Sequence, residues 1–395
     1  MNSFSRLMAL APEEKQAKGV TYIASEIAQQ PRTWAKAVDV LRADREAIND
    51  FMDRTGLTGK SAASLILTGA GTSEFIGNSI VNVLRKRLRR EVISVPTTHL
   101  VTHASSTLVP GHDYVVLSFA RSGNSPESIA TYERVKRVAP QAGHLVITCN
   151  KDGELAKAAS QDGSAHCILL PEETNDRSLA MTSSFSTMAL AGIGLSFMDD
   201  LDGFASLSAR LGEGANRVIS FYGDMISDYA ERPFKRACFL GSNSLYGAMQ
   251  ECHLKMQEMT EGKVACRFDS FLGLRHGPQV FVNGECVVVA ALATDPLVRK
   301  YELDLLRELK AKGQGCGTLV ICDRATQQIR DVATDVVELY PNSEPIDDDY
   351  RVMTDVVAGQ ILATMKSLDL GLKPDTPSVS GTIHRVVQGV VIHEA

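Results

Sequence analysis

The chain has 395 residues, of which 44% are hydrophobic and 22% charged, enough for two α/β domains of about 150 residues each. Only 6% are aromatic while 30 are glycine, a balance that disfavours an all-β fold and suits buried parallel strands. A net charge of −6 argues against nucleic acid as a partner, so the one basic run, Arg85 to Arg90, is interpreted as a solvated helix face.

The sequence carries no pattern typical of export, of a membrane span or of a metal site. Met1 to Lys15 lack the basic start and apolar core of a signal peptide, and no apolar stretch approaches the roughly 18 residues that cross a bilayer. The eight cysteines include no CxxC pair. We therefore expect a cytoplasmic protein with no metal, no cofactor and no structural disulfide.

Residues 1–53 are predicted to form an N-terminal helical segment. Apolar residues recur at helical spacing from about Glu13 to Asp53, and Trp34 is expected to be a packing anchor.

Residues 54–205 are predicted to form a first α/β domain. Strands are expected at Ser64–Thr68, Tyr114–Phe119, His144–Cys149 and His166–Leu170, and helices at Thr72–Arg85 and Pro126–Val138. Strands that alternate with helices imply right-handed crossovers and a parallel sheet.

Residues 206–373 are predicted to contain a linker helix and a second domain of the same kind. Strands are expected at Arg236–Leu240, Cys286–Leu292, Gly317–Cys322 and Val336–Tyr340, and a helix at Leu245–Glu261. Leu67–Ser73 is echoed by Leu240–Ser244, which indicates an internal duplication. The predicted fold is thus α/β, with two tandem domains, each a parallel sheet flanked by helices in three layers.

Residues 374–395 are predicted to be an ordered C-terminal tail over the active site. The tail ends in a run of β-branched residues from Val386 to Ile392, so we expect it to pack against the body of the protein.

Three loops that join a strand to a helix, or open a helix, are rich in small polar residues. Gly69-Ala-Gly-Thr-Ser73 lets the backbone approach a ligand, although a plain tight turn has the same sequence pattern and the GxGxxG spacing for dinucleotides is missing. Phe119–Ser128 offers several short donors for a phosphate, or an N-cap at Ser125. The hydroxyls of Met181–Thr187 open a further helix, and capping explains one or two of them. In open α/β sheets such loops gather at the carboxyl ends of the strands, which places the three motifs around one crevice.

The second half supplies titratable groups. Glu251, Lys255 and Glu258 share one helix face at i, i+4 and i+7, a spacing that also fits a solvated ion-pair ladder. His276 lies between a basic residue and a Gly-Pro turn, where it is a candidate acid or base.

Together these residues resemble two copies of the SIS (sugar isomerase) domain. Ser118–Ser125 is close to its phosphosugar motif, and the second half resembles the isomerase domain of glucosamine-6-phosphate synthase in Leu254–Glu258 and His276–Pro278. More narrowly, Pro96–Thr102, Ala180–Ser184, Asp375–Thr382 and Arg385–Gly389 resemble the AgaS family of galactosamine-6-phosphate deaminases and tagatose-6-phosphate isomerases.

The resemblance implies roles for individual residues. Glu258 would shuttle a proton between C1 and C2, His276 of a neighbouring subunit would help to open the sugar ring, and Lys255 would orient Glu258 or bind an enolate oxygen. A homodimer with composite active sites is implied. The substrate-binding set is Gly71, Thr72, Ser73, Arg121, Ser122, Asn124, Ser125, Thr182, Ser183 and Arg385. Arg385 stands where the synthase has a lysine, and an arginine cannot form a Schiff base.

The implied reaction converts galactosamine 6-phosphate and water to tagatose 6-phosphate and ammonia. No glutaminase domain precedes the double unit in this sequence, so ammonia release is favoured over amide-driven synthesis. Two alternatives stay open: an isomerase acting on another 6-phosphosugar, and a non-catalytic phosphosugar sensor.

Overall fold

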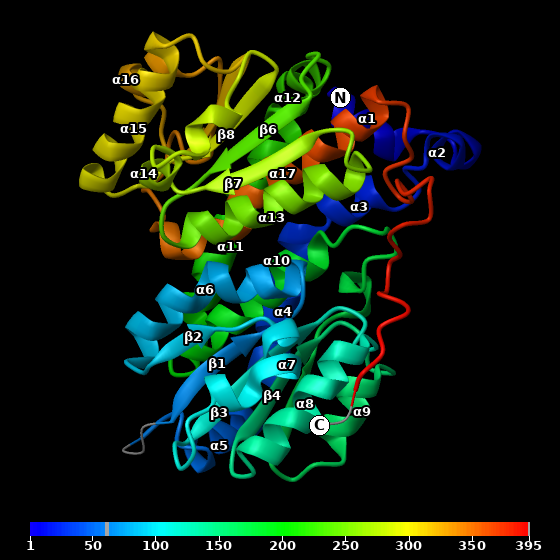
Figure 1. Ribbon diagram of the computed structural model, residues 1–395, viewed down its shortest axis with the longest axis vertical. Helices are drawn as coiled ribbons and strands as arrows, with labels where there is room; N and C mark the ends of the chain where they lie inside the picture. The colour runs from blue at the N-terminus through cyan, green and yellow to red at the C-terminus, as the bar shows by residue number, and fades with distance from the viewer. Residues whose placement is uncertain (60–62, 394–395) are drawn as a thin grey trace. The chain divides into compact units, whose positions relative to one another are not determined.

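The computed structural model describes residues 1–59 and 63–393, which form two compact units (Figure 1). The first-sheet unit comprises Arg32–Asp176, Ser183–Ala209 and Ile383–Ala395. The second-sheet unit comprises Met1–Pro31, Arg177–Thr182 and Arg210–Thr382. Residues 60–62 of the predicted first domain and 394–395 of the predicted tail lie outside the described residues.

The first-sheet unit is built on five parallel strands in the order β2-β1-β3-β4-β5. The strands are β1 (Ser64–Thr68), β2 (Val92–Ser94), β3 (Tyr114–Ala120), β4 (Gly143–Thr148) and β5 (Ala165–Leu169). Every residue of β1, β3 and β4 is buried, which is why these strands read as continuous apolar runs in the sequence. Thr68, the last residue of β1, is the register partner of Ser118, which lies two residues before the end of β3, so the two loops that follow start close together.

Helices cover both faces of this sheet. The helices are α4 (Gln30–Ala43), α5 (Arg45–Arg54), α6 (Thr72–Leu88), α7 (Thr97–Thr107), α8 (Pro126–Val138), α9 (Glu154–Ser160) and α10 (Ser183–Gly194). Ile66 and Val116 form one cluster with residues of α7 and α8. On the opposite face α6 approaches so closely that a Cβ on Gly77 would lie 3.2 Å from that of Leu67. Alternate strand residues thus face the two helix layers.

The second-sheet unit repeats this topology. Its five parallel strands run in the order β10-β9-β8-β6-β7. Read from the β7 edge, this order of connections is the same as in the first sheet. They are β6 (Arg236–Leu240), β7 (Ala265–Asp269), β8 (Cys286–Ala291), β9 (Gly317–Cys322) and β10 (Asp335–Glu338). The identical order of connections confirms the predicted pair of tandem parallel-sheet units.

The helices of this unit are α1 (Ser3–Ala9), α2 (Pro12–Lys18), α3 (Ile23–Ala28), α12 (Gly223–Ala230), α13 (Ser244–Met259), α14 (Phe271–Leu274), α15 (Pro296–Ala311), α16 (Gln327–Val332) and α17 (Asp348–Asp369), and α11 (Leu201–Phe221) leads into the unit. One long buried helix of this unit, α17, packs against α3, α12 and α13. Helices α13 and α17 run side by side (Figure 1). A Cβ on Gly359 would lie 2.4 Å from the Cys252 sulfur, so only glycine allows this approach.

The strands differ from the sequence prediction mainly at the sheet edges. Both β2 and β7 are edge strands that the hydrophobic pattern did not indicate. The expected packing of the apolar run in the tail is wrong for most of its members, since four of them are exposed: Val387, Val390, Val391 and Ile392. Trp34 is buried and donates to Ser186 Oγ at 2.9 Å, as expected of a packing residue. Among the described residues, no helix is long and apolar enough to cross a lipid bilayer.

Candidate active site

The first candidate region is the switch point of the first sheet, between β1 and β3. The chain leaves β1 for β2 on one side of the sheet and later returns to β3 on the other, which opens a crevice at the carboxyl ends of these strands. Gly71 has φ of +57° and directly precedes α6. A Cβ on Gly69 would lie 2.4 Å from the Ser73 backbone. The two glycines therefore bring Thr72 and Ser73, the first residues of α6, close to the end of β1.

The second loop, after β3, is a structured turn in its own right. Ser125 is the N-cap of α8, since its hydroxyl accepts a hydrogen bond from Ser128 N at 3.3 Å. The side-chain oxygen of Asn124 accepts from Glu154 N at 3.0 Å and so caps α9. The capping alternative is thus observed for Ser125 and extends to Asn124. These bonds hold the turn, with Ser122 within it, at the carboxyl edge of the sheet.

The two arginines assigned to substrate binding attach the tail to the first-sheet unit. Arg121, 7% exposed, donates to the carbonyl of Arg385. The Arg385 guanidinium donates to Asp176 O at 2.7 Å and to Asn175 Oδ1 at 2.6 Å. Because both guanidiniums bond to protein oxygens, they fix the tail beside the loop that contains Ser122.

The third motif is organised by an acid that the sequence analysis missed. The Asp176 carboxylate, 1% exposed, accepts from the Ser183 hydroxyl and from Ser184 N at 2.9 Å. It therefore caps α10, and the serine hydroxyls turn inward towards it. Thr182 belongs to the second-sheet unit, where its carbonyl accepts from Gln360 Nε2 at 3.5 Å. In the sequence, the feature that could have indicated this cap is Asp176, an acid shortly before a run of hydroxyl residues.

The second candidate region is the ion-pair chain on α13. Lys255 is fully buried and lies 3.3 Å from Glu251 Oε1 and 2.6 Å from Glu258 Oε2. Glu251 is also fully buried, whereas the Glu258 side chain is 24% exposed. Burial alone would lower the pKa of Lys255, but the two carboxylates more than offset it and hold that pKa above its ordinary value. The solvated-ladder alternative is wrong, because the lysine is buried beneath a carboxylate that reaches the surface.

His276 lies at a different place in the second-sheet unit. It is exposed, in the turn after α14, and Gly277 follows it with φ of +115°. Neighbouring residues anchor the turn: Arg275 Nε lies 2.9 Å from Glu308 Oε2. Glu258 lies 14 positions along α13 from Ser244, about 21 Å from the carboxyl edge of the sheet at which α13 begins. The turn with His276 instead follows the carboxyl end of β7, so one chain does not bring the two side chains together.

The switch point of the second sheet, between β6 and β8, is filled by the protein's own acids. Asp349 Oδ1 accepts from Ser244 Oγ at 2.6 Å and from Asn243 Nδ2 at 2.9 Å. Glu302, 0% exposed, accepts from Ala293 N at 2.8 Å, and burial raises its pKa to about 7. Carboxylates already accept from the donors that follow these two strands, so those donors are not available to an anion. Among the described residues, no group of three or more His, Cys, Asp or Glu side chains is placed to hold a metal ion.

Comparisons with known proteins agree with the fold and with the motifs. A family model described as the SIS domain matches residues 60–193. D-galactosamine-6-phosphate deaminase AgaS of Escherichia coli is 38% identical over 382 residues, which cover 94% of this chain and 96% of that protein. The crystal structure of tagatose-6-phosphate ketose/aldose isomerase from Escherichia coli is 34% identical with a TM-score of 0.85, over 96% of this chain and 98% of that one.

A more distant structure has the same fold. The C-terminal domain of glucosamine-fructose-6-phosphate aminotransferase from Francisella tularensis superimposes with a TM-score of 0.71 at 16% identity, over 89% of this chain and 96% of that one. The relative that is 38% identical matches nearly its whole length and nearly the whole of this chain. The chain belongs to the AgaS family of SIS-domain proteins.

Proposed function

We propose that this chain is a galactosamine-6-phosphate deaminase, which converts D-galactosamine 6-phosphate and water to D-tagatose 6-phosphate and ammonia. Relatives that carry the names of this deaminase and of a tagatose-6-phosphate isomerase support the substrate class. The observation that carries the proposal is Glu258, a partly exposed carboxylate held at 2.6 Å by a fully buried lysine.

We assign the phosphate to the first-sheet switch point. Thr72, Ser73 and Ser122 lie in or beside loops at the carboxyl edge of that sheet, where α6 and α8 begin. The acids at the second switch point favour this assignment, since a dianion there would meet Asp349 and Glu302. The remaining members of the proposed substrate-binding set contribute backbone groups or shape the loops. They are Gly71, Asn124, Ser125, Thr182 and Ser183. Arg121 and Arg385 are assigned to holding the C-terminal tail in place through their hydrogen bonds.

We assign the proton transfers to Glu258. Once the sugar ring is open, Glu258 removes the proton at C2, the enolamine takes a proton at C1, the ketimine hydrates and ammonia leaves. Lys255 is fully buried, so it acts as a positioning residue that fixes the Glu258 carboxylate. Ring opening is assigned to His276 of the partner subunit, because one chain does not place His276 beside its own Glu258. The proposal therefore includes a homodimer. We also propose that the protein acts in the cytoplasm.

A second candidate function is ketose/aldose isomerisation of a 6-phosphosugar without loss of ammonia. The relative named tagatose-6-phosphate ketose/aldose isomerase favours it, and the same base would serve. A phosphosugar sensor without turnover is the third candidate.

Coupled detection of ammonia separates these candidates. Purified protein is given galactosamine 6-phosphate or glucosamine 6-phosphate, and Glu258→Gln is compared with Glu213→Gln, a change at an exposed position on α11. Ammonia from the galacto epimer, lost only in Glu258→Gln, is the expected result. Interconversion of phosphosugars without ammonia would establish the isomerase, and binding without turnover would establish the sensor.

A further inference from the structure

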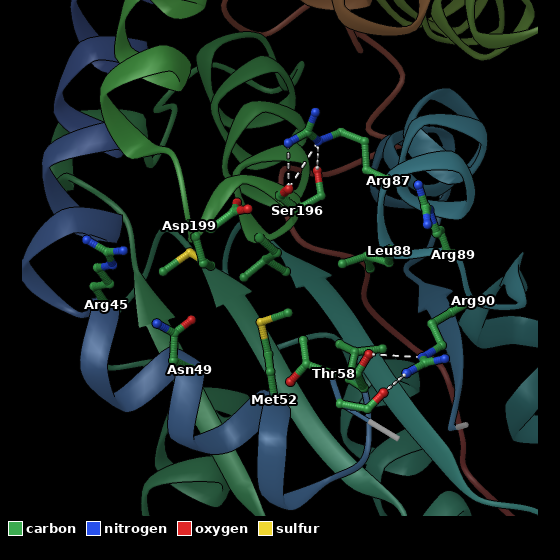
Figure 2. Close-up of a pocket in the computed structure, with 14 residues that line it drawn as sticks. Arg45, Asn49, Met52, Thr58, Arg87, Leu88, Arg89, Arg90, Ser196 and Asp199 are labelled. Atoms are coloured by element: carbon green, nitrogen blue, oxygen red, sulfur yellow. Dashed lines mark hydrogen bonds between the residues drawn. The ribbon is translucent and has the colours of Figure 1, made fainter. Parts of the chain in front are cut away.

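The first-sheet unit contains a cavity of about 590 Å³ that the proposed reaction does not use (Figure 2). It is lined by α5, by the end of α6 with the residues that follow, and by the segment 195–199. Four arginines contribute to its wall: Arg45, Arg87, Arg89 and Arg90. We call it the arginine pocket. The basic run that the sequence analysis interpreted as a solvated helix face thus borders a cavity.

The arginine pocket is separate from the proposed phosphosugar loops. Helix α6 begins at Thr72, beside those loops, and ends at Leu88, which lines the pocket. A helix of 17 residues spans about 25 Å, so the two sites lie at opposite ends of α6. They also lie at opposite edges of the sheet.

Neutral acceptors hold two of these arginines in place. Arg87 donates to Ser196 O at 3.0 and 2.9 Å, and its guanidinium lies 3.3 Å from the centre of the Phe197 ring. Arg90 donates to Leu57 O at 3.3 Å and to Gly59 O at 2.7 Å. Figure 2 shows these bonds at the rim of the cavity. Carbonyl oxygens fix the side chains without cancelling their charge.

The positive charge of the pocket is only partly balanced. Among the described residues that line the pocket, Asp199 is the single acid. Within the part of the chain that the structure describes, none of the four arginines lies within ion-pair distance of a carboxylate. Four cations against one anion leave a surplus of positive charge around one hollow.

The helix dipole does not account for this arrangement. Cations near the end of α6 are favoured by its free carbonyl groups, and this explains Arg85, which donates to Val92 O at 2.6 Å outside the pocket. It does not explain Arg45, which comes from α5. The floor is apolar, with Met52, Leu195 and Met198 among the lining residues.

We propose that the arginine pocket binds a small organic polyanion, with at least two phosphate or carboxylate groups on an apolar or planar body of nucleotide size. The volume lies within the usual range of ligand sites, roughly 300–1,000 Å³. Arginine forks match phosphate and carboxylate oxygens, and the apolar floor takes the body of the ligand. A hexose monophosphate, polar throughout, fits the pocket less well.

Calorimetric titration of the full chain at physiological salt tests this inference, with ATP, inorganic pyrophosphate and galactosamine 6-phosphate as probes. The test variant is Arg45→Glu with Arg89→Asn. Both side chains are exposed and asparagine suits the left-handed backbone at position 89, where φ is +53°. The matched control is Arg137→Glu, an exposed arginine at the end of α8.

We expect ATP to bind at least five-fold more tightly than pyrophosphate, and the double variant to weaken ATP at least ten-fold. Arg137→Glu should change ATP affinity less than two-fold. The proposed site would be overturned if ATP binding were undetectable, or if Arg137→Glu weakened ATP binding as much as the double variant does. Equal affinity for pyrophosphate and ATP would overturn the proposal that the ligand has an organic body. Circular dichroism confirms that each variant is folded. Galactosamine 6-phosphate binding should persist in the double variant, which separates failure of this inference from failure of the proposed function.

Discussion

Lys255 is a buried cation that pairs with two carboxylates of its own helix. Removing it leaves Glu251 buried without its cation and releases Glu258. Breaking a buried ion pair from one side costs about 3–5 kcal/mol. We predict that Lys255→Met destabilises the protein by that amount in urea unfolding, and that Lys255→Met with Glu251→Gln recovers part of the loss. A change below 1 kcal/mol would contradict the buried pairing.

Glu302 gives a pH dependence of stability whose sign follows from its raised pKa. Its pKa is about 7 in the folded protein against an ordinary value of 4.5, so the folded state holds its proton more tightly than the unfolded state. The free energy of unfolding that this tighter proton binding contributes is present below the ordinary pKa and is lost as pH rises from about 4.5 to 7.

Glu302→Gln removes this titration. Because one pKa unit corresponds to about 1.36 kcal/mol, the stability of the variant relative to the native protein should rise by roughly 2.5 kcal/mol between pH 5 and pH 8. Urea unfolding at the two pH values measures the difference. Glu213→Gln is the control, and a pH-independent difference would show that Glu302 is not the titrating group.

At the scale of elements, the packing of α13 on α17 depends on Gly359. Alanine there would gain up to about 1 kcal/mol of helix propensity but would place its Cβ against the Cys252 sulfur. Overpacking of this kind costs about 1–3 kcal/mol. We predict net destabilisation by Gly359→Ala, with partial rescue by Cys252→Ala, measured as a double-mutant cycle in thermal unfolding. Strict additivity would contradict direct contact.

The tail should be held mainly by Arg385. Its bonds to Asp176 O and Asn175 Oδ1 are lost in Arg385→Ala, and lysine restores the charge but not the fork. Amide hydrogen exchange in residues 383–393 should become at least ten-fold faster in Arg385→Ala and should be intermediate in Arg385→Lys. Arg137→Ala should leave it unchanged. Unaltered exchange in Arg385→Ala would mean that other contacts hold the tail.

The sequence predicted buried elements better than edge elements. β1, β6 and β9 were placed within their observed bounds, because central parallel strands are continuous apolar runs. β2 has only three residues, and β7 carries Arg267 and Asp269 among partly buried positions. Edge strands bury less surface, so the hydrophobic pattern that identifies strands is weak there.

The candidate site was predictable as motifs but not as contacts. The spacing of Glu251, Lys255 and Glu258 fixed their shared helix face, whereas their burial depends on the packing around α13, including α17. Likewise Asp176, which orders the serines of α10, precedes them by seven or more positions in an irregular segment. An acid before a run of hydroxyl residues is a weak local signal, and it does not specify the contact that the folded segment makes.

At the scale of the whole molecule, the two sheets share one strand order but have switch points with different side-chain chemistry. One presents hydroxyls and helix N-termini, and the other is filled with Asp349 and Glu302. The separation of Glu258 from His276 within one chain predicts composite sites in a homodimer. Mixing Glu258→Gln with His276→Asn after subunit exchange should restore about a quarter of native activity. Continued inactivity in mixed dimers would contradict a composite site.

Glu258 is proposed to move the C2 proton of galactosamine 6-phosphate. The most direct measurement follows D-galactosamine 6-phosphate deuterated at C2, with ammonia release and the deuterium content of the ketose product recorded together. We predict a primary isotope effect, partial transfer of deuterium to C1, and a turnover that falls roughly 10²–10⁴-fold in Glu258→Gln but not in Glu213→Gln. Full turnover by Glu258→Gln, or release of ammonia without loss of the C2 deuterium, would contradict this proposal.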